Sequence, residues 1–415
     1  MARLTPKEPE FKLYKTGFDG DLLDRKASGA ALSGLVERIE DPMVIALDGG
    51  WGTGKSWFLK RWVGQHRTDY PGKARTVYFD AFAHDYLDDP LVALTALLTK
   101  ELAKETSPAS DKISRLKRTA FKALPGLTKL SANVATAFAI KALDDTGDIL
   151  ADAIGGAVEG SSDAFWQSVA DQQTAMEEFA SALKALTLTD NEDTPRKLVI
   201  VVDELDRCRP DYALSLLEVI KHFFAVDHVH FVLGVNLREL ENMVRVRYGT
   251  QEGAALYLQK FVTLTMELEK LRARVREAND GSSLYFEVPD YIQKRSRALG
   301  VNKKTTRVLN IGLGPLYQRE NFSLRHCDQI LRYVALLPSD TTKLCNEAYF
   351  SDPIPQNDPS KRRLLLVVLL ICKAIFPDVF AKIKKGEATR GVSETLCMRL
   401  SPCEFVGSFV EPFWV

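Results

Sequence analysis

The 415-residue chain has little cysteine, no excess of charge of either sign and no long apolar run. None of its six cysteines is spaced as CxxC, so the sequence favours reduced thiols over a disulfide framework or a clustered metal site. Lys plus Arg equals Asp plus Glu at 55 each, which argues against a general coat for nucleic acid or membrane. Local charge clusters still leave either contact open.

The apolar runs are too short for a membrane helix. The uncharged stretch 130–140 and the more apolar 364–372 are both well below the ~20 residues that a span needs. The first residues, MARLTPKEPEF, lack the apolar segment of a signal peptide. We therefore expect a cytoplasmic protein without a membrane span.

Four short apolar runs predict buried strands at 43–47, 74–82, 197–206 and 229–236, and helical patterns lie between them. Strands that are almost continuously apolar suit a parallel sheet that is covered on both faces. The alternation predicts an α/β, doubly wound arrangement.

Composition divides the chain into three parts. Residues 1–105 and 171–270 carry the strand and helix alternation and form the predicted core. Residues 106–170 are rich in Ala, Gly, Ser and Asp, with weak periodicity, and we interpret them as a largely helical insertion. Strand signals fade after about residue 270, so 271–415 is expected to be a helical C-terminal domain.

The strongest motif follows the first predicted strand. In ALDGGWGTGKSWFL, the pattern Gly49-x4-Gly54-Lys55-Ser56 lies between a strand and a helix, as a phosphate-binding P-loop requires. Glycines let backbone N–H groups turn toward phosphates, the lysine supplies charge, and the serine hydroxyl can ligate Mg²⁺. The predicted nucleotide-binding residues are Gly49, Gly50, Trp51, Gly52, Thr53, Gly54, Lys55, Ser56 and Trp57.

A second motif, VIVVDELD, ends in two adjacent acids. Asp203 lies where a P-loop enzyme places the carboxylate that holds Mg²⁺, so Ser56 and Asp203 are the expected metal residues. Glu204 follows, where a carboxylate can orient the attacking water. The alternative is a helix cap plus a surface acid.

Asn236 follows the strand at 229–236 and is expected to sense the γ-phosphate or the water, or else to cap the next helix. The arginines that we consider for transition-state charge are Arg207, Arg245, Arg247, Arg325 and Arg332. Of these, Arg325 is placed to reach back from a C-terminal helix. The expected catalytic residues are Glu204, Lys55, Asn236 and Arg325.

Basic clusters at 293–307 and 382–385 are interpreted as solvated faces, with nucleic-acid contact as the alternative.

In several stretches, taken in order, the chain resembles the KAP P-loop NTPases. The stretches are DLLDRKASGAALSGLVERI, the P-loop with Trp51, YFDAFAHDYLDDPLVAL, VIVVDELDRCRPDYALSLLEVIKHFF and, more weakly, RRLLLVVLLICKAIFPDVFAKI. Phe82 stands where the family usually has Trp, and Glu204 where many members have Asp. The resemblance implies a P-loop NTPase three-layer sandwich of the additional-strand class.

The resemblance also implies roles for residues. Lys55 and Ser56 would bind phosphate and Mg²⁺, and Asp203 and Glu204 would serve metal and water. Asp206, Arg207 and Cys208 belong to the family signature without a clear role. Many relatives carry transmembrane helices in the insertion, but here Lys141, Asp144, Asp145, Asp148 and Asp152 interrupt it.

The leading functional hypothesis is an Mg²⁺-dependent ATPase, a conformational switch or motor subunit that binds ATP between the α/β core and the helical region. The resemblance implies a role in bacterial antiphage defence, with protein partners from the same operon, a homo-oligomer, or both. One alternative is a scaffold that binds nucleotide without hydrolysing it. Another is an ATPase stimulated by nucleic acid through 293–307.

Overall fold

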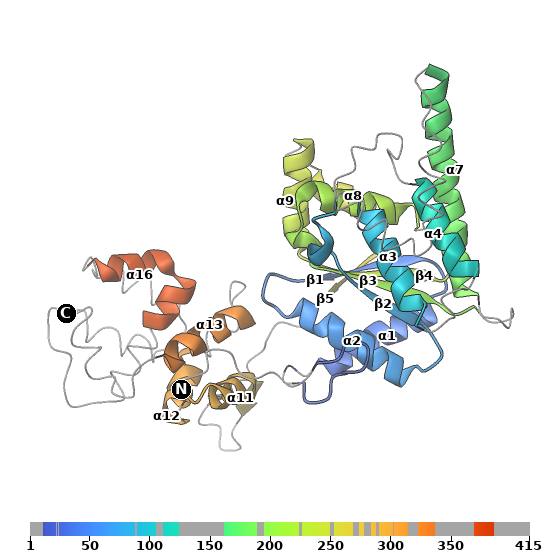
Figure 1. Cartoon of the computed structure of the whole chain (residues 1–415). Coiled ribbons are helices and arrows are strands. Elements are labelled where there is room, and N and C mark those ends of the chain that lie inside the picture. Colours follow the sequence, from blue (N-terminus) through green and yellow to red (C-terminus); the bar gives the residue numbers. More distant parts are fainter. Residues whose placement is uncertain are drawn as a thin grey trace, which may run out of the picture.

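The protein is described by a computed structural model, shown in Figure 1. Its described residues are 11–21, 23, 25–87, 89–104, 111–123, 162–188, 195–223, 226–249, 253–268, 274–277, 284–287, 290–301, 303–313, 323–336 and 369–385. Within these ranges, no helix combines the length and the apolar character needed to cross a membrane.

A five-stranded parallel sheet forms the centre of the fold. Its strands are β1 (Met43–Asp48), β2 (Arg75–Asp80), β3 (Leu198–Asp203), β4 (Val229–Val235) and β5 (Leu264–Glu267), in the order β2-β3-β4-β1-β5. The four predicted strands are confirmed, but 74–82 and 197–206 were drawn too long, since short 3₁₀ turns follow β2 and β3. Strand β4 separates the strand that precedes the P-loop from the strand that ends in the acids. The edge strand β5 was not predicted, because its four residues are mostly exposed and give no apolar run.

Helices cover both faces of the sheet (Figure 1). On one face lie α1 (Lys26–Arg38) and α2 (Lys55–Asp69), and on the other α3 (Pro90–Leu102), α8 (Pro210–Lys221) and α9 (Leu237–Tyr248). Side chains alternate along each strand, so Ile45 and Val201 pack with Trp62 of α2, whereas Val44 and Val202 enter the core on the opposite face. The predicted three-layer sandwich is confirmed.

Local signals set where helices begin. Asp89 caps α3 by accepting a hydrogen bond from the backbone N–H of Leu91 at 2.8 Å, and Pro90 occupies the first turn. Helix α2 begins at Lys55, directly after the P-loop glycines, which confirms the predicted order of strand, loop and helix.

The described parts of the insertion are helical. Helix α4 (Asp111–Ala123) packs its buried Leu116 and Ala120 in the core that also holds Phe179 and Leu183 of α7 (Ser162–Thr187). Helix α7 runs through residues 170 and 171, where composition placed a boundary, and extends away from the sheet in Figure 1. The predicted helicity of 124–161 lies outside the described residues.

The C-terminal helices have a hydrophobic core of their own. Helices α11 (Asp290–Ala298), α12 (Lys303–Leu313), α13 (Leu324–Ala335) and α16 (Pro377–Lys384) surround buried side chains that include Ile292, Leu309, Leu331 and Cys372. An antiparallel pair, β6 (Arg274–Glu277) and β7 (Leu284–Glu287), precedes them and was not predicted. A short helix, α10 (Ala254–Gln259), connects α9 with β5.

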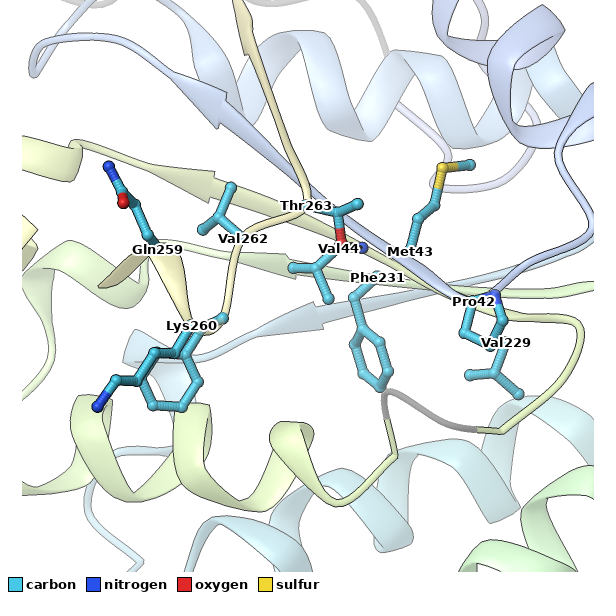
Figure 2. A pocket seen from close by; sticks show the side chains of 10 residues that line it. Pro42, Met43, Val44, Val229, Phe231, Gln259, Lys260, Val262 and Thr263 are labelled. Carbon is cyan, nitrogen blue, oxygen red and sulfur yellow. Dashed lines mark hydrogen bonds between the residues drawn. The ribbon is translucent and has the colours of Figure 1, made fainter. Parts of the chain in front are cut away.

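A cavity of about 310 Å³ lies at the amino ends of β1 and β4 (Figure 2). Its wall consists of 42–44, Val229, Phe231 and 259–263. The P-loop leaves β1 at the opposite end of that strand, so this hollow is not part of the predicted nucleotide site.

Candidate nucleotide-binding site

The P-loop runs from the end of β1 to the start of α2. Gly52 and Gly54 have φ angles of +80° and +89°, in the region where side chains with a Cβ are strained. The backbone N–H of Gly49 donates to the carbonyl of Val235 at 3.2 Å, which ties the start of the loop to the end of β4. The glycines thus let the chain turn tightly and expose its backbone.

Lys55 is folded into this loop. Its side chain is buried, with the residue 7% exposed, and Nζ donates to the carbonyls of Gly49 and Gly50. Burial lowers the pKa of Lys55, and the carboxylates of Asp206 and Asp203 oppose that shift. The ammonium group is therefore held by backbone oxygens of the loop itself.

Asp203 is the last residue of β3, and it is fully buried. It accepts hydrogen bonds from the Tyr78 hydroxyl at 2.5 Å and from the backbone N–H of Glu204 at 2.9 Å. Burial raises the pKa of the Asp203 carboxyl, while hydrogen bonds from Tyr78 and Ser56 act in the opposite direction. Gly234 of β4 makes room for it, because a Cβ there would lie 2.6 Å from Asp203 Oδ1.

Glu204 has a left-handed backbone conformation, with φ +60° and ψ +24°. Such strain in a non-glycine residue costs about 1–3 kcal/mol and concentrates at functional sites. The carboxylate accepts hydrogen bonds from Ser56 Oγ at 3.1 Å and from Arg207 Nη1 at 2.7 Å, both at Oε1. The structure thus brings the P-loop serine and the two acids together, although 148 positions separate Ser56 from Glu204.

Asn236 lies at the N-cap position of α9, beside the P-loop anchor on β4. Its side chain makes no capping hydrogen bond, so the interpretation of that side chain as the cap is wrong. Asp48 takes this role, since its Oδ1 accepts from the backbone N–H of Leu237 at 2.9 Å. The amide of Asn236 is therefore not committed to the helix end.

The C-terminal helices contact the P-loop through the first turn of α13. The backbone N–H of Leu324 donates to the carbonyl of Gly52 at 3.1 Å. A Cβ on Gly52 would lie 2.8 Å from Ser323 Oγ and 3.0 Å from the Cβ of Arg325. Arg325 is exposed beside the loop, while Ser323 caps α13 in a reciprocal capping box with His326.

Arg25 holds the same loop from the N-terminal side, a role that no sequence pattern predicted. Its guanidinium donates to the carbonyls of Thr53 at 2.8 Å and Gly54 at 3.3 Å. Asp21 orders the turn before it by accepting from the backbone N–H of Arg25 at 2.6 Å. A single arginine at the start of an amphipathic helix has no distinguishing pattern, so only the tertiary contact identifies it.

Other candidate residues lie away from this cluster. The ring of Trp57 packs near Phe18 and lies under the guanidinium of Arg61, 4.4 Å from its centroid. Arg245 pairs with Glu241 within α9. Arg247 pairs with Asp211 of α8, and Arg332 is exposed on α13. These residues do not join the cluster around Ser56 and Glu204.

The described residues contain no group of three or more His, Cys, Asp or Glu side chains arranged to hold a metal ion. Two carboxylates and one hydroxyl nevertheless meet at the carboxyl ends of β1 and β3. That is the edge of a parallel α/β sheet at which ligands bind.

Comparison with known proteins identifies the family. No protein of curated function matches the sequence. Among solved structures, the Aeropyrum pernix ORC2 protein in ADPNP–ADP complexes aligns at a TM-score of 0.35 and 12% identity, covering 98% of this chain and 81% of that chain. That likeness is too low to support any argument. The KAP family P-loop domain matches residues 29–308, more than half of the sequence, and the chain therefore belongs to the KAP family of P-loop NTPases.

Proposed function

We propose that this KAP-family protein is an Mg²⁺-dependent ATPase in which hydrolysis changes the contact between the α/β core and the C-terminal helices. One observation carries the proposal: the hydroxyl of Ser56 donates a hydrogen bond to Glu204, beside the buried Asp203. A P-loop serine joined to the acids at the end of a neighbouring strand is the arrangement that phosphoryl transfer requires.

The loop fits a nucleotide triphosphate. Gly52 and Gly54 adopt the positive φ angles that turn backbone N–H groups inward, and the N-terminus of α2 adds partial positive charge. Lys55 would exchange the carbonyls of Gly49 and Gly50 for phosphate oxygens. When bound, ATP supplies the phosphoryl group that is transferred.

The oxygen groups fit Mg²⁺. This ion binds through one or two carboxylates together with phosphates and waters, rather than in a cage made by protein alone. Ser56 and Asp203 would hold it, since a hydroxyl and a carboxylate are the hard oxygen ligands that it prefers. Bound there, Mg²⁺ would neutralise negative charge on the phosphates.

The remaining residues have distinct proposed roles. Glu204 orients the attacking water and accepts its proton, with the ion pair to Arg207 fixing the carboxylate. Asn236, uncommitted at the tip of β4, contacts the phosphate or the water. Arg325 adds charge from α13, and the contact of α13 with Gly52 conveys the state of the loop to the C-terminal helices.

The test uses purified full-length protein with ATP and Mg²⁺, measuring phosphate release. Removing Lys55 in Lys55→Ala is expected to lower turnover at least about a hundredfold, because it removes charge aimed at the phosphates. The exposed Lys100→Ala serves as the control and should retain turnover. Turnover that persists in Lys55→Ala would contradict the assignment of the site.

Glu204→Gln separates hydrolysis from binding. It keeps the shape of the side chain but removes the base, so phosphate release should fall about a hundredfold while a non-hydrolysable ATP analogue still binds. Equal loss of binding would instead make Glu204 a structural residue. A wild type that binds nucleotide without releasing phosphate would favour the scaffold alternative.

The alternative of stimulation by nucleic acid stays a prediction, since Lys294, Arg297 and Lys303 of 293–307 are exposed. Arg295 there is committed to Asp328 at 3.2 Å. We also propose that the protein acts with protein partners, by self-association, or both.

The proposed antiphage role has its own test. Phage plaques are counted on cells that carry the native operon with either the wild-type protein or Lys55→Ala. Equal plaque counts would reject the role.

A further inference from the structure

The apex of the P-loop is tied to the segment that follows β3 by a side-chain hydrogen bond. The indole N–H of Trp51 donates to Asp206 Oδ2 at 2.6 Å, across 155 positions of sequence. Trp51 is 49% exposed, whereas Asp206 is only 3% exposed. A half-exposed aromatic ring thus reaches from the loop to a buried carboxylate on the short 3₁₀ turn Leu205–Arg207.

The buried carboxylate of Asp206 is stabilised by few interactions. Among the described residues, the Trp51 indole is the one group that donates a hydrogen bond to the side chain of Asp206. Asp206 is also the first of the carboxylates that favour the charged form of Lys55. A buried acceptor that loses its donor keeps its full desolvation penalty, so the Trp51 bond is expensive to break.

The position of this bond matters for the site. Trp51 directly precedes Gly52, which α13 contacts, and Asp206 lies two residues after Glu204. The bond therefore spans the gap between the phosphate loop and the strained residue that contacts Ser56. If it is absent, the loop and the acid can drift apart while each remains folded.

We propose that Trp51 and Asp206 form a positioning pair that holds the P-loop apex against the end of β3 during ATP hydrolysis. The pair acts through Ser56 and Glu204 and does not itself exchange a proton or touch the reacting atoms. This inference rests on the proposed ATPase function. It gives Trp51 a role other than the direct nucleotide binding that the P-loop motif predicted.

The experiment is a double-mutant cycle on full-length protein, with kcat and KM for ATP measured in Mg²⁺. Trp51→Phe removes the N–H and keeps a ring, whereas Asp206→Ala removes the acceptor. Each is expected to lower kcat about tenfold with KM changed less than about threefold, since misplacement of reacting groups affects the chemical step. The double variant should remain about tenfold below wild type, because the second change removes nothing further.

A conservative variant and a matched control sharpen the result. Asp206→Asn retains an oxygen that accepts from the indole and should keep kcat within about threefold of wild type. Tyr248→Phe removes another aromatic donor to a carboxylate and should leave kcat unchanged. Tyr248 is the last residue of α9, and its hydroxyl donates to Glu218 of α8 at 2.9 Å. If Trp51→Phe does not fold, as judged by thermal unfolding, the contrast between Asp206→Asn and Asp206→Ala still decides.

Several outcomes would overturn the pair. They are an unchanged kcat in Trp51→Phe, a change confined to KM, a double variant about a hundredfold slower, or Asp206→Asn as slow as Asp206→Ala. In each case a wild type that turns over ATP leaves the proposed function standing. A wild type without turnover rejects both.

Discussion

The carboxyl ends of the parallel strands form one edge of the central sheet and their amino ends form the other, and polar side chains are used differently at the two. At the carboxyl edge, Lys55 and Ser56 bind backbone carbonyls and a carboxylate at the mouth of a glycine loop. At the amino edge, Lys197 donates to the carbonyls of Val36, Glu37 and Ile39, at 3.1, 2.7 and 2.6 Å, and so closes the end of α1.

The two edges differ in whether a ligand can replace the groups that these polar side chains bind. The partners of Lys55 and Ser56 lie at the open end of β1, where phosphate and metal are proposed to bind. The partners of Lys197 are the last carbonyls of a helix, which have no intrahelical donor and remain after any ligand binds. Substitutions at the carboxyl edge should therefore reduce activity, and substitutions at the amino edge should reduce stability.

Gly234→Ala should reduce both ATP hydrolysis and stability, because Gly234 pairs with Asp203 on the neighbouring strand. The added Cβ would lie 2.6 Å from Asp203 Oδ1 and would overlap Leu59 Cδ1. Overpacking of this kind costs about 1–3 kcal/mol of unfolding free energy. ATP hydrolysis should fall at least about tenfold because the carboxylate proposed to hold the metal is displaced. Urea unfolding and phosphate release measure the two effects.

Gly34→Ala is its control. A Cβ at Gly34, within α1, meets nothing within 4 Å. Replacing a helical glycine by alanine should stabilise the protein by about 0.5–1 kcal/mol and leave hydrolysis unchanged. Equal behaviour of the two variants would contradict the assignment of Gly234 to the site.

Lys197→Met should reduce stability with little effect on turnover. It removes the charged donor from three carbonyls and keeps most of the aliphatic chain. Hydrogen bonds to charged groups contribute about 1.5–3 kcal/mol, so the unfolding free energy should fall by about that amount. The exposed Lys73→Met is the control. A loss of kcat without a loss of stability would refute the contrast between the edges.

The pH dependence of stability should show a smaller effect at the amino edge. Burial, together with Lys197, lowers the pKa of His230 from its ordinary 6.5 to about 4. Between pH 6.5 and about 4, His230 is protonated in the unfolded chain but neutral in the folded protein. The unfolding free energy is therefore highest above pH 6.5 and decreases as the pH falls. Relative to its value well above pH 6.5, the unfolding free energy should be lower by about 1.4 kcal/mol at about pH 5.5. Urea unfolding of His230→Leu should show a flatter acid limb; an equal slope would contradict the prediction.

Sequence patterns predicted the strands that are apolar throughout. The run at 43–47 became β1, and 229–236 became β4 at 229–235, since a strand covered on both faces leaves an unbroken apolar run. The same rule explains the failures. Strand β5 is mostly exposed, and β6 and β7 have four residues each, so neither gives a run long enough to recognise.

At the site, the P-loop and the acids were recognisable because their spacing is local. Tyr78 and Arg25 were not, because the first contacts Asp203 across 125 positions and the second contacts Thr53 across 28. A tyrosine in an apolar strand is the usual composition of a buried sheet, and nothing near it in sequence marks its hydroxyl.

The sequence by itself determined which chemistry is available: a glycine loop with Lys55 and Ser56, and two acids at the end of a buried strand. Those features depend on neighbouring residues and on hydrophobic periodicity, which a linear pattern records. Only the tertiary structure decided which groups meet. The order β3-β4-β1 brings Ser56 to Glu204, and Trp51 reaches Asp206. The physical reason is that each contact spans about 150 residues and depends on strand order and burial, which local sequence does not encode.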